Sequence, residues 1–94
     1  MRKSHSLKTL PEHYQEIKAR RKKAELRKND RDYRKGDLLI LEEWSPTGGG
    51  LYTGEQILAI VTHILADPEF GLKEGYVLMS IEVIRAFEAW EDRQ

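Results

Sequence analysis

The sequence of 94 residues contains no cysteine. Without thiols it cannot form a disulfide framework, a thiolate metal site or a cysteine nucleophile. Its longest apolar stretches, such as residues 38–41 and 57–60, are far shorter than the roughly 20 residues of a membrane-spanning helix. Residues 1–10 also lack the apolar centre of a signal peptide. We therefore expect a soluble, cytoplasmic chain without a membrane partner, folded as a single domain over residues 1–94.

The charge is unevenly distributed, although the net charge of the whole chain is zero. Residues 1–37 carry 13 Lys or Arg and 6 Asp or Glu, a net charge of +7, whereas residues 38–94 carry 3 and 10, a net charge of −7. A basic first third is typical of a surface that meets phosphate groups. Two alternatives remain open: the halves neutralise each other within one fold, or the acidic face of one copy meets the basic face of another in a homo-oligomer.

Apolar spacing predicts one helix near the beginning of the chain. Leu10, Tyr14 and Ile17 recur at the intervals that place side chains on one face of a helix over residues 11–19. Pro11 suits the first turn, where its missing N–H would have no helical partner. This helix should pack its apolar face on the rest of the fold.

Five segments have the composition or the alternation of strands. They are residues 5–9, 23–28, 38–42, 55–65 and 76–83. Residues 55–65 also fit a helix by period alone, but their branched side chains favour a strand. The spacing of Ile84, Phe87 and Trp90 predicts a short helix or turn over residues 84–94. The fold class is therefore α+β and mainly β, a small barrel of about five strands with a core over residues 5–83.

The strand over residues 23–28 alternates apolar and charged side chains. We expect Ala24 and Leu26 to face the core, and Glu25 and Arg27 to share the other face about 7 Å apart. The apolar centre is expected to contain Leu26, Leu39, Leu41, Ile60, Val77 and Met79. On the charged face, Arg27 offers a planar fork to a phosphate or a base edge, and Glu25 an acceptor to an exocyclic amine. The alternative is a set of ion pairs on a solvated face.

Further candidate ligand contacts surround this strand. Arg31 and Arg34, together with Lys35, are predicted to contact phosphate at the rim; the alternative is a solubilising turn. Trp44 and Tyr52 flank the glycine-rich loop at residues 45–50, so they can stack on a base when the loop closes, or simply pack on the barrel. The histidines show no metal-ligand spacing with Asp or Glu, and no metal or cofactor is expected.

Residues 20–37, RRKKAELRKNDRDYRKGD, together with EEWSP and YTG further on, resemble the ASCH family, the activating-signal-cointegrator homology domains. The resemblance runs from His5 to about Val83 and is to a small, single-domain branch of phage-type and bacterial proteins, largely of unknown function. It implies a PUA-like β-barrel with a cleft that binds RNA or nucleotides. The family motif Gly-x-Lys-x-x-Glu-x-Arg falls on Arg20, Lys22, Glu25 and Arg27, so three of its four positions match.

The departure from the motif is Arg20, where the family has glycine. A glycine after a helix commonly adopts the left-handed conformation, which costs other residues roughly 1 kcal/mol. Either Arg20 accepts this strain or the helix ends differently. Lys22 faces away from Glu25 if it belongs to the strand, and can reach the cleft if the strand begins later.

Three functions follow from these features. The first is a module that binds RNA or a nucleotide-like ligand through Lys22, Glu25 and Arg27. The second is an amidohydrolase acting on an acylated nucleoside, as the resemblance implies for some small ASCH-type barrels; the motif lysine and a hydroxyl residue at the position of Glu25 would be catalytic. The hydroxyl is absent here, although Glu25 can still activate water. The third is a protein-interaction module based on the charge asymmetry, which a size measurement across a salt series would test.

Overall fold

A computed structural model describes residues 2–89 of the chain. In this part the chain forms one α-helix, five strands and two short 3-10 turns. The α-helix is α1 (Pro11–Lys18), and the turns are Thr47–Gly49 and Pro68–Phe70. The strands are β1 (Ser4–Thr9), β2 (Ala24–Lys28), β3 (Leu38–Ser45), β4 (Leu51–Leu65) and β5 (Tyr76–Phe87). The predicted mainly β architecture with one N-terminal helix is confirmed.

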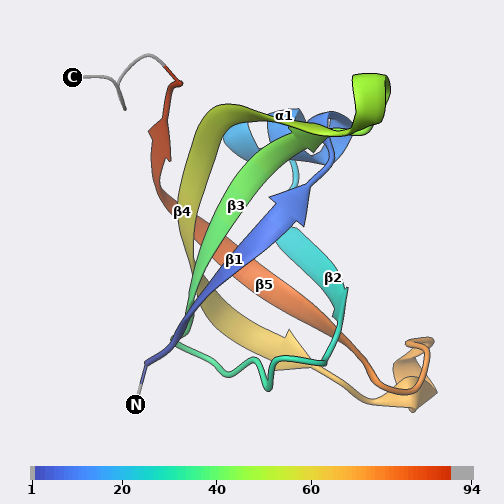
Figure 1. Cartoon of the computed structure of the whole chain (residues 1–94). Helices are drawn as coiled ribbons and strands as arrows, with labels where there is room; N and C mark the ends of the chain where they lie inside the picture. Colours follow the sequence, from blue (N-terminus) through green and yellow to red (C-terminus); the bar gives the residue numbers. More distant parts are fainter. Residues whose placement is uncertain (1, 90–94) are drawn as a thin grey trace.

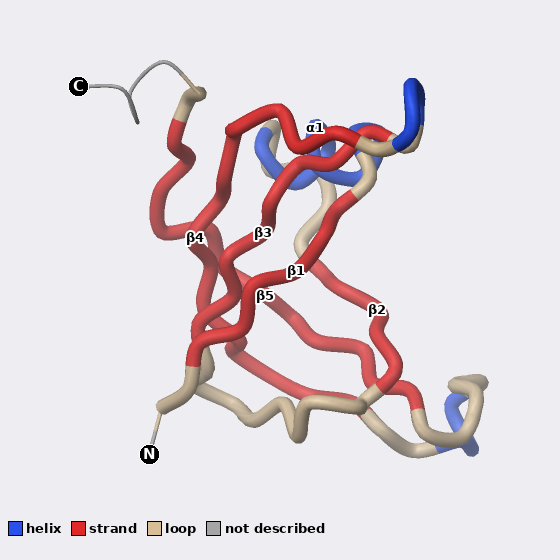
Figure 2. Tube along the Cα trace, in the orientation of Figure 1, coloured by secondary structure: helices blue, strands red, loops and turns tan. Residues whose placement is uncertain are grey.

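The five strands form one sheet in the order β1-β3-β4-β5-β2. β1 runs parallel to β3, and the other neighbours are antiparallel. The sheet curls into a half-barrel with α1 at one end, and β1 and β2 form its two edges (Figures 1 and 2). Within residues 2–89 these edges do not pair with each other. The barrel expected from the sequence is therefore open on the side between β1 and β2.

Register shifts bend the long strands into this shape. One interrupts the β3–β4 pairing between Glu42 and Trp44, and two interrupt the β4–β5 pairing, between Leu58 and Ala59 and between Val61 and His63. A bulge of this kind bends a strand and increases its local twist. Curvature brings the inner faces of the central strands together around a single apolar core.

The core confirms most of the predicted apolar centre. Leu39, Leu41, Val77 and Met79 are buried, and Ile60 is partly buried on the outer face. Leu26 is not in the core: it is 56% exposed. The prediction assigned the side chains of β2 to the wrong faces of the sheet, and the pairing with β5 explains why.

On β2, Glu25 lies opposite Met79, and Arg27 lies opposite Val77. Directly opposite residues in an antiparallel pair project to the same face of the sheet. Glu25 and Arg27 therefore point to the inner, concave side, and Leu26 points outward. The two charged side chains do share one face, as expected, but it is the face that the core occupies elsewhere.

The predicted C-terminal helix over residues 84–94 is wrong in its first part. β5 continues through Phe87, where Ala86 pairs with Ile57 and Phe87 with Gln56. β4 begins earlier than expected, at Leu51, but the partners that extend β5 lie within the expected strand over residues 55–65. Backbone pairing with that strand, which the spacing of Ile84 and Phe87 does not show, keeps residues 84–87 extended. The remainder of the predicted helix, residues 90–94 with Trp90, lies outside the described residues.

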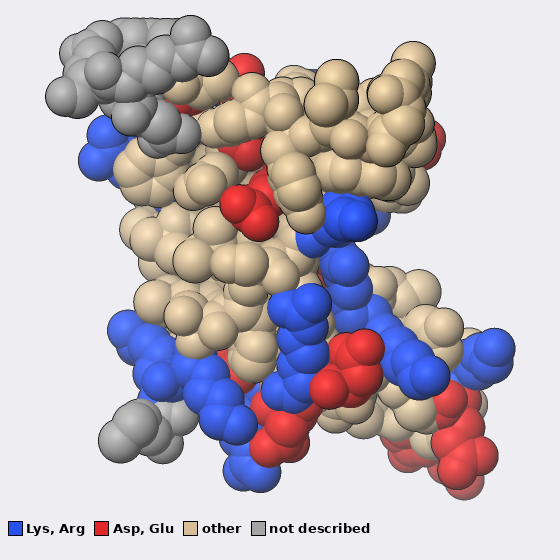
Figure 3. Space-filling model, in the orientation of Figure 1, with Lys and Arg blue, Asp and Glu red and all other residues tan. Residues whose placement is uncertain are grey.

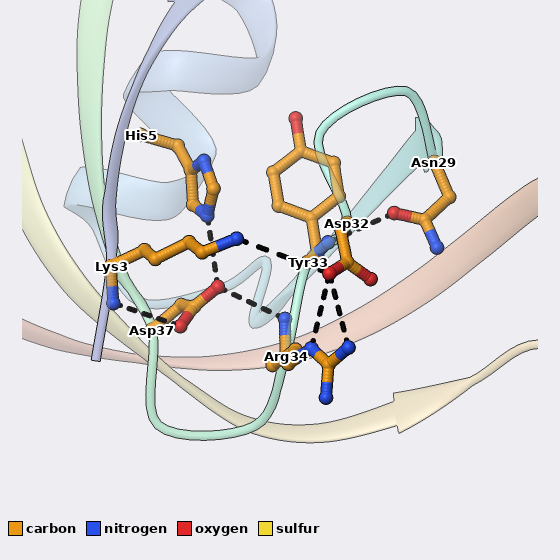
Figure 4. Close-up of polar contacts among 7 residues, drawn as sticks. All are labelled: Lys3, His5, Asn29, Asp32, Tyr33, Arg34 and Asp37. Carbon is orange, nitrogen blue, oxygen red and sulfur yellow. Dashed lines mark hydrogen bonds and ion pairs between the residues drawn. The ribbon is translucent and has the colours of Figure 1, made fainter. Parts of the chain in front are cut away.

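The connection between β2 and β3 is held by one buried carboxylate, that of Asp37 (Figure 4). Its Oδ2 lies 2.8 Å from His5 Nε2, and the backbone N–H groups of Lys3 and Arg34 donate to its two oxygens. The His5 ring packs edge-on against Tyr33, with 4.8 Å between ring centroids. Asp37 therefore ties the start of β1 to the 29–37 loop.

The hydrogen bonds also determine the ionisation of this group. Burial alone would raise the pKa of Asp37, but the hydrogen bonds from His5, Lys3 and Arg34 outweigh burial and hold the pKa below its ordinary value. Asp37 is thus a carboxylate that the fold stabilises in its charged form. Among residues 2–89, no helix is long and apolar enough to cross a membrane.

Candidate functional site

A cleft of about 350 Å³ opens where β1, α1 and β2 meet. We call it the motif cleft. Its polar lining residues are Lys8, Thr9, His13, Lys22, Glu25 and Arg27, and its apolar ones are Leu10 and Leu26. The cleft lies beside the open edge of the half-barrel, where no strand of the described residues 2–89 pairs with the other side of β2. This is the place where the inward-facing charges of β2 can remain accessible.

Glu25 and Arg27 form the inner wall of the motif cleft. Glu25 is only 4% exposed, and its Oε2 accepts a hydrogen bond of 2.8 Å from Arg27 Nε. Arg27 also donates through Nη2 to the carbonyl oxygen of Lys8, at 2.9 Å. Within residues 2–89, no other group donates to Glu25. Its second carboxylate oxygen is therefore available as an acceptor for a ligand.

Lys22 reaches the same cleft because it is not part of the strand. β2 begins at Ala24, so Lys22 lies in the turn after α1. The alternation of faces along the strand therefore does not determine the direction of its side chain. Its Nζ lies 3.0 Å from Nδ1 of His13, on α1. An ammonium group has only donors, so the lone pair of a neutral imidazole accepts this contact. The turn thus brings Lys22 into one cleft with Glu25 and Arg27.

The preceding turn shows how Arg20 accommodates the position where the motif has glycine. Arg20 has a φ of +62°, in the left-handed region. Its N–H donates to Ile17 O, and the N–H of Arg21 donates to Glu16 O, both at 3.0 Å. These two bonds are the Schellman pattern that ends a helix. The helix ends as it would with glycine, and Arg20 bears the strain.

Two of the predicted phosphate contacts are engaged within the fold. Arg31 Nη1 donates to the carbonyl oxygen of Ser6, at 2.7 Å, and Arg34 pairs with Asp32, with contacts of 3.1 and 3.2 Å. Arg27 and Arg31 thus bind two carbonyls on the free edge of β1, those of Lys8 and Ser6. These guanidinium groups bridge the open side of the half-barrel. Figure 3 shows Lys and Arg gathered there, around β2.

Trp44 and Tyr52 face each other across β3 and β4, at the base of the glycine-rich turn. Neither lines the motif cleft. Trp44 is nonetheless connected to it, because Lys8 Nζ lies 4.3 Å from the centre of the Trp44 ring. The ring also packs under Gly50, where an added Cβ would lie 2.5 Å from it. Tyr52 is 55% exposed.

Three polar residues of the motif cleft were not predicted from the sequence: Lys8, Thr9 and His13. Lys8 and Thr9 end β1, and His13 lies on α1, so no short motif joins them to Glu25 and Arg27. Thr9 Oγ1 donates to the carbonyl oxygen of Leu7, at 3.3 Å. These residues become part of the site only when β1 and β2 lie opposite each other at the open side.

A second polar cluster, also not predicted, surrounds Lys18 at the end of α1. Lys18 binds both Glu55, at 3.3 Å, and Glu88, at 2.7 Å. Burial raises the pKa of the nearby Tyr14 phenol, and the carboxylates of Glu55, Glu43 and Glu88 raise it further. Tyr14 is thus a neutral phenol in the core. Residues 2–89 contain no group of three or more His, Cys, Asp or Glu side chains arranged to hold a metal ion.

Comparison with known proteins identifies relatives of this chain. The sequence profile of a family described as a domain of unknown function, DUF3850, matches residues 4–81. The chain is also 35% identical over 79 residues to a protein of Escherichia phage P2, described as an uncharacterized 12.9 kDa protein in the GpA 3′ region. That match covers 84% of this chain and 68% of the phage protein. The half-barrel and its motif cleft lie largely within the matched residues, and the chain belongs to the DUF3850 family.

Proposed function

We propose that the motif cleft binds a nucleotide, either free or as part of single-stranded RNA. The observation that carries this proposal is the meeting of Lys22, Arg27 and the nearly buried Glu25 in one cleft of about 350 Å³. Small-molecule sites typically have volumes of about 300–1,000 Å³ and a few convergent polar groups. The size suits one nucleotide rather than a long segment of nucleic acid.

The polar groups match the chemistry of such a ligand. The ammonium groups of Lys8 and Lys22 suit a phosphate, since both are point charges that carry only donors. The free oxygen of Glu25 can accept a hydrogen bond from an exocyclic amine of a base. Leu26, 56% exposed, offers an apolar surface at the same cleft. A ligand with an anionic end and an amine-bearing ring satisfies all these groups.

The resemblance of residues 20–27 to the ASCH motif supports the same ligand class, and a PUA-like classification of the half-barrel is part of this proposal. Arg27 has a double role in it. Its guanidinium orients Glu25 and also holds the edge of β1 through the carbonyl of Lys8. It therefore positions the wall of the site more than it contacts a phosphate.

A chemical-shift titration with a panel of nucleotides and short single-stranded RNAs tests the proposal. We expect shifts concentrated at Lys8, Lys22, Glu25 and Arg27. The variant Glu25→Gln should alter which base is preferred, because an amide replaces one acceptor oxygen with a donor. Glu69→Gln, on an exposed turn, is the matched control and should leave the preference unchanged. Absence of binding at low salt, or shifts confined to other surfaces, would contradict the proposal.

A second candidate is hydrolysis of an acylated nucleoside. It is favoured by the presence of Lys22 and Glu25 in one cleft, with His13 in contact with Lys22. Because position 25 has no hydroxyl, we expect little or no release of acid from N4-acylated cytidine. Rapid turnover that Lys22→Ala abolishes would instead establish the enzyme.

A further inference from the structure

A second cleft, of about 420 Å³, lies between the end of α1 and strands β4 and β5. We call it the helix-end cleft. Its polar lining residues are Arg20, Lys22, Lys23, Thr62 and Glu82. Three cations thus surround it, against one carboxylate. Lys22 lines both this cleft and the motif cleft, so the two are adjacent.

Among residues 2–89, the cations of the helix-end cleft have no acidic partner, unlike three other arginines of residues 20–37. Arg21 pairs with Glu16, Arg27 with Glu25 and Arg34 with Asp32. Among residues 2–89, no carboxylate lies within ion-pair distance of Arg20 or Lys23. Their charges are therefore available to an external anion, and both side chains are exposed.

Arg20 also occupies a backbone position that disfavours it. Its φ of +62° is one that glycine adopts without strain. Strained backbone positions that persist often serve a binding site. Here the strained residue projects a cation that the fold itself leaves unpaired, at a cleft that already holds two lysines. The strain and the missing partner are independent observations that favour the same interpretation.

We propose that the helix-end cleft is a subsite for a phosphate of single-stranded RNA, next to the nucleotide held in the motif cleft. This inference rests on the proposed function and adds the path of the RNA, which runs from the motif cleft, past Lys22, to Arg20 and Lys23. Lys22 then lies between two phosphate groups of the same RNA. A free mononucleotide fills the motif cleft and does not need the helix-end cleft.

The experiment compares two probes, a nucleoside 5′-monophosphate and a single-stranded RNA trinucleotide, by calorimetry at several salt concentrations. The variant is Arg20→Gly, which removes the cation and relieves the strained backbone, so weaker binding cannot be attributed to unfolding. Arg2→Gly makes the same change of charge at an exposed residue that lines neither cleft. Lys23→Ala is a second variant of the same cleft.

Arg20→Gly should weaken binding of the trinucleotide about three- to ten-fold at low salt, as expected for one charge-assisted contact. The slope of log affinity against log salt should fall by about 0.7, the value for one phosphate contact on a single strand. Binding of the mononucleotide should change less than about two-fold, and Arg2→Gly should change neither probe beyond that. Lys23→Ala should act like Arg20→Gly.

The outcomes separate the two proposals. If the mononucleotide binds but the trinucleotide gains no affinity over it, or if Arg20→Gly and Arg2→Gly weaken the trinucleotide equally, the helix-end subsite is wrong and the motif cleft stands. If neither probe binds the unmodified protein at low salt, both proposals are wrong.

Discussion

Strands β2 and β3 differ in their inner faces. The first half of β3 carries Leu39 and Leu41 there, both 0% exposed, and its one buried charge, Glu43, lies near the end of the strand and accepts hydrogen bonds from Gln15 and Thr53. On β2 the inner face carries Glu25 and Arg27. In the part of the chain that the structure describes, β3 pairs with a strand on each side, whereas β2 pairs with β5 alone. A charged inner face is tolerable on β2 because the open side of the half-barrel leaves Arg27 27% accessible in its side chain. The edge position, not the alternation of residue types, decides where the site forms.

The largest expected effect concerns the buried apolar side chains on the inner face of β3. Leu41→Ala should lower the free energy of unfolding by about 3 kcal/mol, because it removes a fully buried side chain and leaves a cavity in a core that can relax only partly. Urea unfolding followed by circular dichroism measures the change. Loss of less than about 1 kcal/mol would mean that the inner face of β3 is not the closed core described above.

The next test concerns the loop that joins the two strands. Asp37→Asn should lower the free energy of unfolding by about 2 kcal/mol at pH 7. The carboxylate accepts hydrogen bonds through both oxygens, whereas the new amide replaces one of them with an N–H₂ group that faces another donor. His5, Lys3 and Arg34 supply the donors. Urea unfolding at pH 7 gives the difference.

The pH dependence provides a separate check on Asp37. Its pKa is lower in the folded chain than its ordinary value of 3.8, so its contribution to stability is complete above that value. The contribution is lost as the pH falls through the lower, folded pKa. The unmodified protein should therefore lose more stability than Asp37→Asn between pH 5 and pH 2. Parallel losses in the two proteins would contradict the role given to this carboxylate.

Much of this fold was predictable from local pattern, and the parity of β2 was not. The helix near Tyr14 and the buried strand at Leu39 follow from apolar spacing, which depends on each segment alone. In β2, Ala24 and Leu26 alternate with charges, and burial of the apolar set is the ordinary expectation. The pairing with β5 at an open edge reverses it, and a single sequence does not reveal which strand is an edge.

The site was predictable to a similar extent. Glu25 and Arg27 were identified as a pair because their spacing along a strand is local information. The approach of Lys8 and His13 depends on β1 lying across the open side from β2, so it required the topology. The failed helix over residues 84–87 has the same cause, since its strand conformation depends on the register that pairs Ala86 and Phe87 with Ile57 and Gln56 of β4.

A smaller effect, of opposite sign, concerns the turn that leads into β2. Arg20→Gly should raise the free energy of unfolding by about 1 kcal/mol, because glycine adopts the left-handed conformation without the steric penalty of a side chain. Arg20→Ala is the control: it removes the guanidinium but keeps Cβ, so it should give no such gain. Equal stability of the two variants would show that backbone strain at this position is negligible.

The smallest expected effect tests which face of β2 carries Leu26. Leu26→Gln should change the free energy of unfolding by less than about 0.5 kcal/mol, as is usual for exposed positions, because Leu26 is 56% exposed. Leu41→Gln, the same change on the inner face of β3, buries an amide without a partner and should prevent stable folding. If Leu26→Gln were instead as damaging as Leu41→Gln, β2 would have the opposite parity. Glu25 would then face solvent, and the motif cleft would lose its wall. Near-neutral stability, combined with altered affinity for a nucleotide at the cleft that Leu26 lines, would support both the inverted parity and the proposed site.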